Sequence, residues 1–207
     1  MSRICPRDVL RLSNPPAPGR VARPWPSCER TGMAHPTLAD LEAALDSIRA
    51  APRDTGTVTL VVRRPGEDQR EVLEVGQLDP DSGLVGDAWM QGDHGVDDQL
   101  TLMNSRAIDL LAGDRERWPL AGDQLYVDFD LSEEALPAGT RLAVGEAVVE
   151  VSPVPHRGCA KFAERFGHDG LRFVNTPTGR ALRLRGVYVR VVVAGVVRPG
   201  DAIRRMA

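Results

Sequence analysis

The sequence predicts an all-β fold, a β-barrel with a few short helices, and three observations support this class. Short segments rich in valine, leucine and tyrosine recur along the chain, glycine-containing turns separate them, and few segments show a helical period. Short strands joined by such turns are typical of barrels rather than of α/β folds. The 207 residues suffice for one domain and a leader. We expect a leader at 1–32, a helical N-terminal extension at 33–55 and a barrel domain at 56–207.

The leader and the extension differ in pattern. Residues 1–32 are rich in proline and arginine and show no periodicity, which predicts disorder. They contain no apolar run of the kind found in a secretory signal. Residues 38–50 are predicted to form a helix, because Thr37 is a good N-cap and Asp40 follows three residues later. One stripe of this helix is apolar: Leu38, Leu41, Leu45 and Ile48.

The middle of the chain alternates predicted strands with one helix. A "PGED" turn separates the first two strands, which predicts a hairpin. Ser105 is the expected N-cap of the helix. The predicted elements are strands at 57–64, 70–76, 98–104 and 123–130, a helix at 105–113, and two short strands on either side of Gly145.

Segment 186–195, "GVYVRVVVAG", carries the strongest strand signal in the chain. Valine occupies every second position from 187 to 193, while Tyr188, Arg190 and Val192 share the other face. A last strand is expected after the Pro-Gly-Asp turn at 199–201.

Composition excludes several classes of protein. The net charge of −3 argues against a general nucleic-acid binder. Three scattered cysteines form neither a disulfide framework nor a paired zinc motif, which favours a reducing, cytoplasmic location. No apolar run reaches the roughly 18–20 residues that a membrane span needs.

Charge is distributed unevenly along the chain. Residues 67–150 contain 20 acidic and 5 basic residues, whereas residues 156–205 contain 3 acidic and 11 basic residues. Solvated strand faces would explain this distribution. Alternatively, the basic third of the chain faces an anionic ligand such as a phosphate.

Cys159 lies in the stretch "SPVPHRGCAKFAERFG", residues 152–167. Prolines stiffen the approach to the cysteine, and Gly158 allows a backbone geometry closed to other residues. Cys159, Phe162 and Phe166 then follow helical spacing, which places the sulfur in the first helical turn. Free backbone N–H groups and the helix dipole favour a thiolate there. A thiolate can attack, carry sulfur or bind a soft metal.

Basic neighbours strengthen this interpretation. His156, Arg157 and Lys161 add positive charge around Cys159 and would lower the pKa of its thiol. A small buried hydrophobe remains the plain alternative, since free cysteines often have that role. A zinc site built on His156 and Cys159 lacks a second pair of ligands in the sequence.

Four segments together resemble the MOSC domains, which are related to the C-terminal part of molybdenum cofactor sulfurases. "PVPHRGCAKFAERFG" and "RLRGVYVRVVVAGVVRPGDAI" resemble the family's cysteine turn and its closing segment. Upstream, "GDAWMQGDHGVDDQLTLMNSRAIDLL" and "LAGDQLYVDFDLS" are similar to two further family segments. The resemblance covers about residues 56–205. The sequence differs from the family's segments at two places. It has "GDQL" instead of a "GENL"-type motif, and "VDDQ" instead of proline-aspartate-arginine, so that a basic residue is missing there.

The resemblance implies a β-barrel that binds molybdenum cofactor of the molybdopterin type. Cys159 would be the catalytic residue, as metal ligand or persulfide carrier, beside His156, Arg157 and Lys161. Relatives that reduce N-hydroxylated compounds suggest the same activity here, on a small-molecule substrate. Electrons or sulfur would then come from a partner protein, because the sequence has no iron–sulfur cysteine cluster. A non-catalytic cofactor or persulfide carrier, and a degenerate member without cofactor, are the alternatives.

Five further residues are candidates for contacts with the cofactor, and a second cofactor is not expected. Asp93 and His94 lie on a glycine-flanked loop where they would line the pocket or stabilise a turn, and Asp123 has the same two interpretations. Arg185 and Arg190 would contact an anion at the barrel mouth or face solvent. Pyridoxal phosphate needs a lysine for its Schiff base. Lys161 is the single lysine and has no pyridoxal-like surroundings in the sequence, so we expect none.

Overall fold

The computed structural model describes residues 35–92 and 95–206. The elements expected at 1–32 and the candidates Asp93 and His94 lie outside these ranges. In chain order the helices and strands are α1 Leu38–Ala43, α2 Leu45–Arg49, β1 Thr55–Arg63, β2 Glu71–Leu73, β3 Gly76–Asp79, β4 Gly83–Leu84, η1 Ala88–Gln91, η2 Val96–Asp98, β5 Leu100–Asn104, α3 Ser105–Ala112, η3 Arg115–Ala121, β6 Leu125–Asp128, β7 Arg141–Val144, β8 Ala147–Val151, α4 Ala160–Asn175, α5 Pro177–Ala181, β9 Val187–Val193, β10 Gly195–Val197 and β11 Ala202–Arg205.

Seven strands close into a barrel, which confirms the predicted fold class. Their order is β11-β7-β8-β9-β5-β6-β1, and β1 pairs back with β11 to complete the ring. Strand β2 extends the sheet beyond β1, and β10, β3 and β4 form a small second sheet. All the pairs are antiparallel except β5–β6, whose parallel strands are joined through α3 and η3.

Strand β1 is the closing strand because it is long enough to pair with three others. Its first residues pair with β11, its middle with β6 and its last with β2. The pairing with β6 shifts register between Val58 and Leu60, as a β-bulge does. The bulge lets Val58 and Val61 both enter the barrel core while Leu60 and Val62 face the helices.

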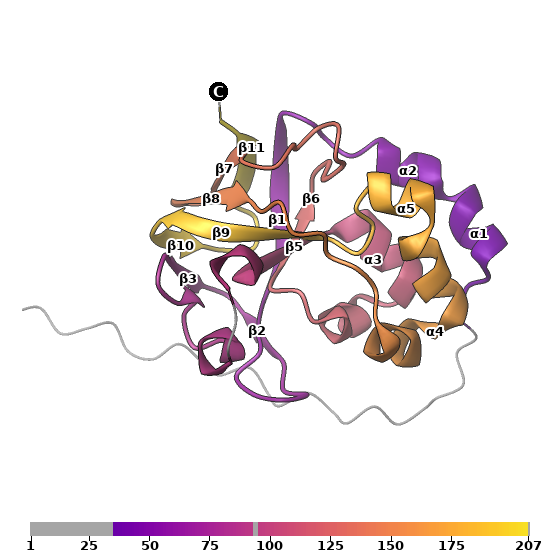
Figure 1. The fold of residues 1–207 in the computed structure, drawn as a ribbon, viewed down its shortest axis with the longest axis horizontal. Helices are drawn as coiled ribbons and strands as arrows, with labels where there is room; N and C mark the ends of the chain where they lie inside the picture. The colour runs from indigo at the N-terminus through magenta and orange to yellow at the C-terminus, as the bar shows by residue number, and fades with distance from the viewer. Residues whose placement is uncertain (1–34, 93–94, 207) are drawn as a thin grey trace, which may run out of the picture.

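Two apolar cores follow from this arrangement. One fills the barrel with side chains from its strands, including Leu100, Leu102 and Val189. The other lies between the outer face of β1, β5 and β6 and the helices, which gather on one side of the barrel (Figure 1). Leu41 and Ile48 of the N-terminal helices belong to this second core. The helices therefore cover a sheet face that solvent would otherwise reach.

Most predicted elements are present, with differences at their ends. The helix expected at 38–50 is divided at Ala44, whose N–H bonds the carbonyl of Leu41 in a tighter turn. The predicted capping box at its start is present, since Thr37 accepts from the N–H of Asp40. The cap of α3 is Asn104 rather than Ser105, because the Asn104 side chain accepts hydrogen bonds from two backbone N–H groups of the first turn.

Strand β9 has the predicted alternation over most of its length. Val187, Val189 and Val191 are buried, whereas Arg190 is exposed. Val193 was predicted to share a face with these three valines, but it is half exposed. It lies at the end of the strand, where the chain turns into β10. Within the described ranges, no helix is long and apolar enough to cross a bilayer.

Candidate functional site

Cys159 is presented at the surface by the loop that joins β8 to α4. It is the N-cap residue of α4 in an extended conformation, and its side chain makes no capping hydrogen bond. The thiol is free and exposed. The prediction of a sulfur at the start of a helix thus matches the backbone, with Cys159 one position before the first helical residue. An exposed thiol does not fit the alternative of a small buried hydrophobe.

Gly158 has a different role from the one predicted. It is not among the glycines with positive φ. A Cβ at this position would instead lie 2.8 Å from Leu171 Cδ1 and 2.9 Å from Val174 Cγ2, both on α4. The Asn175 amide also donates to the Gly158 carbonyl at 3.3 Å. Close packing of the loop against α4 therefore favours glycine here, because a larger residue would displace side chains of α4.

A buried cluster of ionisable side chains lies next to this loop. Arg185, at the end of the α5–β9 connection, donates to Asp123 Oδ2 at 2.7 Å and to the carbonyl of Ala121 at 2.9 Å. His156, from the loop itself, has its Nδ1 3.8 Å from Asp123 Oδ1. The side chains are 10%, 0% and 8% exposed for Arg185, Asp123 and His156. The fold thus brings together three residues that the sequence predicted as site residues.

Three atoms of this cluster are buried without a hydrogen-bond partner among the described residues: Asp123 Oδ1, His156 Nδ1 and Arg185 Nε. Burial raises the pKa of Asp123, and the charge of Arg185 opposes this rise. Burial, and then the charges of Arg185 and Arg64, hold the pKa of His156 well below its ordinary value. His156 is therefore neutral at pH 7.

Two aromatic rings connect the cluster to β9 and to α4. The His156 ring packs on Tyr188 of β9 with 4.3 Å between ring centroids. The Arg185 guanidinium lies 5.1 Å from the centre of the Phe162 ring in the first turn of α4. The N–H of Phe162 bonds the Cys159 carbonyl at 3.0 Å. The cluster is thereby held against both ends of the segment that carries Cys159.

Several arginines converge on the segment that precedes Asp123. The carbonyls of residues 118–122, at the end of η3, each accept a hydrogen bond from a side chain, and four of the five donors are guanidinium groups. In order along the acceptors, the donors are Tyr126 Oη at 2.7 Å, Arg70 Nε at 3.2 Å, Arg165 Nη1 at 2.9 Å, Arg185 Nη2 at 2.9 Å and Arg64 Nη1 at 2.9 Å. We call Arg64, Arg70, Arg165 and Arg185 the arginine cluster.

Sequence reasoning missed most of the arginine cluster and its acidic partner. Arg64 bonds both oxygens of the buried Asp87, at 2.8 Å and 3.0 Å. Gln124 connects Asp87 to the N–H and hydroxyl of Thr101. Asp87 lies in the "GDAWMQGDHG" segment that carried the family resemblance, which was the available signal. No signal in the sequence pointed to Arg64, because an arginine at the end of a strand usually indicates a solvated charge.

The remaining predicted residues lie apart from the buried cluster. Lys161 is exposed and pairs with Glu67 at 3.3 Å. Arg190 is paired with Glu150 on the outer face of the barrel. Arg157 is exposed in the loop. Among the described residues, no group of three or more His, Cys, Asp and Glu side chains could hold a metal ion by itself.

Comparisons with known proteins agree with the fold. The family model of the MOSC domain matches residues 90–204. The YuaD protein from Bacillus subtilis has a similar structure, with a TM-score of 0.55 and 16% identity over 72% of this chain and 94% of that chain. A second crystal structure, of a hypothetical protein, gives a TM-score of 0.53 and 21% identity over 78% and 71% of the two chains. No curated protein matches the sequence.

Proposed function

Because the chain belongs to the MOSC domain family, we propose that it binds molybdenum cofactor through Cys159 and reduces N-hydroxylated compounds. The observation that carries the proposal is the free, exposed Cys159 thiol at a helix start, which makes no capping hydrogen bond. Phe162, in the helical turn that follows, lies against the Arg185 guanidinium of the buried cluster. Thiolate sulfur is a soft ligand that suits a metal such as molybdenum.

The described residues fit such a cofactor in two respects. Cys159 offers one sulfur ligand, which suffices only for a metal whose cofactor brings further ligands. Arg70 suits the phosphate of the pterin tail, since guanidinium groups bind phosphate through paired hydrogen bonds. The other three members of the arginine cluster are each paired with a carboxylate: Arg64 with Asp87, Arg165 with Asp68 and Arg185 with Asp123. Among the residues that the structure describes, the Arg70 guanidinium donates to two carbonyl oxygens, those of Pro119 and Gln69. Burial is the main reason that the pKa of Arg70 is lowered, and the charges of Arg165 and Arg64 lower it further.

The protein's own residues would hold the cofactor and keep its surroundings fixed. When bound, the cofactor would supply a metal centre able to accept the oxygen atom of an N–O bond. Reduction of a hydroxylamine to an amine and water consumes two electrons and two protons. An external donor must supply the electrons, because the chain has three cysteines and no cluster-binding motif. His156 and the Asp123–Arg185 pair would keep the Cys159 loop in place against β9.

Metal content and turnover test the proposal together. The protein is produced in a cofactor-synthesising host beside a Cys159→Ser variant, with Cys28→Ser as the control that removes a thiol from the leader. We expect near-stoichiometric molybdenum and reduction of a hydroxylamine substrate by an artificial donor in wild type and control, and loss of both in Cys159→Ser. Molybdenum without turnover would favour a carrier module. Molybdenum absent from all three samples would contradict cofactor binding.

A further inference from the structure

Two polar atoms of the buried cluster face each other without a hydrogen bond. Asp123 Oδ1 and His156 Nδ1 are 3.8 Å apart, and both are buried without a partner among the described residues. A buried polar atom that stays unpaired is costly. A hydrogen bond between nitrogen and oxygen needs about 2.9 Å, so a movement of the His156 loop by about 1 Å would satisfy both atoms at once.

The carboxylate of Asp123 is held so that this oxygen is available to His156. Its other oxygen accepts from Arg185 Nη1 at 2.7 Å. Gly186 leaves room beside Oδ1, because a Cβ at this glycine would lie 3.3 Å from that oxygen and 2.5 Å from the Leu102 carbonyl oxygen. The permanent charge of the arginine keeps Asp123 ionised, although burial raises the pKa of this carboxyl. An ionised carboxylate can only accept, so His156 Nδ1 has to carry the proton of the bond.

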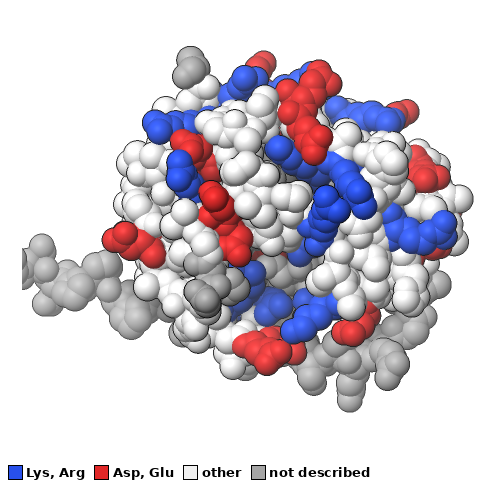
Figure 2. Space-filling model, viewed as in Figure 1, with Lys and Arg blue, Asp and Glu red and all other residues white. Residues whose placement is uncertain are grey.

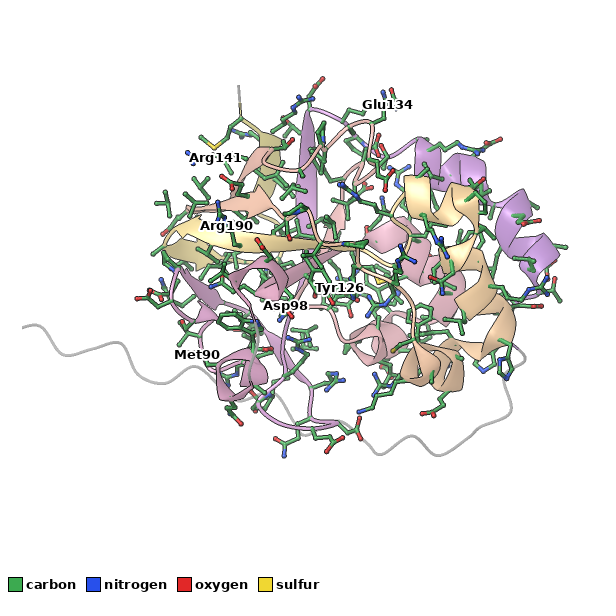
Figure 3. The ribbon with its side chains drawn as sticks, viewed as in Figure 1. Met90, Asp98, Tyr126, Glu134, Arg141 and Arg190 are labelled. Carbon is green, nitrogen blue, oxygen red and sulfur yellow. The ribbon has the colours of Figure 1, made fainter. Side chains whose placement is uncertain are left out.

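The backbone that carries Asp123 is anchored on both sides. Arg64 donates to the carbonyl of Gly122, the preceding residue, at 2.9 Å. Tyr126, three residues later, donates from its Oη to the Trp118 carbonyl at 2.7 Å, and Figure 3 shows Tyr126 near the centre of the molecule. The fold therefore sets the position of Asp123, and His156 is the partner that adjusts to it.

The His156 ring has one buried nitrogen and one that reaches the surface. Its Nδ1 faces Asp123, and the ring packs on Tyr188 with 4.3 Å between centroids. Its Nε2 makes no hydrogen bond with a described residue and, unlike Nδ1, is not buried, so it belongs to the 8% of the side chain that is exposed. Arg185 and Arg64 are the other charged groups that face the ring, and burial together with these charges keeps it neutral by lowering its pKa. A neutral ring with its proton on Nδ1 presents an unprotonated Nε2 to a ligand.

We propose that Asp123 holds His156 in the Nδ1–H form and that His156 Nε2 accepts a hydrogen bond from the substrate bound beside Cys159. His156 precedes Cys159 by three residues. Three residues span at most about 11 Å, so one small molecule can contact both side chains. Asp123 acts through His156 and is therefore a positioning residue. The role toward the substrate rests on the proposed function, whereas the position of the proton on the ring does not.

An acceptor at this place favours substrates that keep a hydroxyl group on the nitrogen. Basic and acidic side chains are interspersed over the face seen in Figure 2. The basic side chains can only donate hydrogen bonds, so they do not replace Nε2 as an acceptor. The N–O–H group of a hydroxylamine or an amidoxime can donate to Nε2, whereas a tertiary amine N-oxide has no hydrogen on its oxygen. The arrangement therefore selects N-hydroxylated compounds over tertiary N-oxides.

Nuclear magnetic resonance of the full chain without cofactor tests the position of the proton. Long-range proton–nitrogen correlations of isotope-labelled histidine distinguish protonated from unprotonated ring nitrogens, and a His156→Gln variant identifies the signals of His156. We expect a protonated Nδ1 and an unprotonated Nε2 at pH 7. The Nε2–H form, a charged ring, or the mixture of both neutral forms that a free imidazole shows would overturn the proposal.

The variant Asp123→Asn separates positioning from a merely structural role. An asparagine that offers its oxygen to Arg185 turns its N–H group toward His156 Nδ1, which then has to accept, so His156 should change to the Nε2–H form. The matched control is Asp128→Asn, which removes a carboxylate paired with Arg106 and should leave the His156 signals unchanged. An unchanged proton position in Asp123→Asn would overturn the positioning role. If circular dichroism shows this variant to be unfolded, the wild-type spectrum decides.

Substrate selectivity of the molybdenum-loaded protein tests the acceptor. His156→Phe keeps a ring against Tyr188 but has no acceptor, so its kcat/KM should fall about three- to tenfold more for an amidoxime than for a tertiary N-oxide. The control His168→Phe, at an exposed position of α4, should change neither value. Equal losses on the two substrates would overturn the role of Nε2. Absence of turnover in wild type, with the Nδ1–H form present, would refute the proposed function and the substrate role but confirm the Asp123–His156 arrangement.

Discussion

Replacement of Arg185 by methionine tests whether the Asp123–Arg185 pair is a buried ion pair whose loss is costly. The substitution keeps most of the side chain's length and its contact with Phe162, but removes the bond to Asp123 and the bond to the Ala121 carbonyl. Asp123 then stays fully buried without its main counter-charge. Breaking one side of such a pair costs about 3–5 kcal/mol. A typical domain has about 5–15 kcal/mol in all, so the variant should lose a large part of its stability.

Urea denaturation followed by circular dichroism, with linear extrapolation to water, measures this loss. The matched control is Arg190→Met, which removes an exposed arginine from a pair and should cost no more than about 1 kcal/mol. The double variant Asp123→Asn/Arg185→Met should recover at least half of the loss, because it removes the uncompensated charge.

The destabilisation caused by Arg185→Met should depend on pH, and the pKa of Asp123 determines the direction of this dependence. Without Arg185, the pKa of Asp123 rises further above its unfolded value, because burial remains and the opposing charge is gone. A carboxyl with a raised folded-state pKa contributes stability at low pH that is lost as the pH rises. The difference in unfolding free energy between wild type and Arg185→Met should therefore become smaller as the pH falls from 7 toward 5. Three results would refute the reasoning. Arg185→Met could lower the unfolding free energy by less than about 1 kcal/mol, or the double variant could be no more stable than the single one. The difference in unfolding free energy from wild type could also increase in acid.

Two further predictions concern the same region. His156 has a folded-state pKa well below its unfolded value, so the unfolded chain binds more protons and the unfolding free energy should fall as the pH drops below about 6.5. In His156→Gln the unfolding free energy should fall less steeply with decreasing pH, by up to about 1.4 kcal/mol per pH unit. Urea denaturation at several pH values measures this slope, and equal slopes for wild type and variant would contradict the prediction. Gly186→Ala should cost at least about 2 kcal/mol, because φ is +95° and a Cβ would lie 2.5 Å from the Leu102 carbonyl oxygen. Gly113→Ala, with φ +69° and open space, should cost less by thermal or urea unfolding, and similar losses for both would show that the close approach does not matter.

The fold was predictable because its signals are local. Alternating valines in 186–195 correspond to β9, and the glycine-centred pair of strands corresponds to β7 and β8. The 38–50 helix was predicted as one element, whereas the structure divides it at Ala44. The spacing of apolar residues shows which face of a helix is buried, but it does not show where a tighter turn interrupts the helix. Strand β1 has three pairing partners, and this closure depends on residues far apart in the sequence.

Three residues of the buried cluster were named from the sequence, but the contacts between them were not predictable away from the cysteine. The turn before Cys159 and the helix after it follow from prolines, a glycine and apolar spacing. The interaction of Asp123 with Arg185 joins residues 62 positions apart. Arg190 has the same residue type and nearly the same place in the sequence as Arg185, yet it pairs with Glu150 on the outer face. Arg185 is covered by Phe162 of α4 and bonds the Ala121 carbonyl, whereas Arg190 is exposed on β9, so the elements that cover each side chain decide between the two.

By itself the sequence determined that this protein is a β-barrel with a cysteine at the start of a helix, because strand alternation, turn residues and helix starts are encoded by neighbours in the chain. The exposure of the thiol was decided by the tertiary structure. Only the tertiary structure decided which charges meet. Arg64, Arg70, Arg165 and Arg185 come from four separate segments, and each bonds one of the carbonyls of residues 119–122, which come within reach only once η3 is packed against α3 and α4. Burial then sets the protonation of Asp123 and His156, since the low polarity around a group depends on everything that covers it.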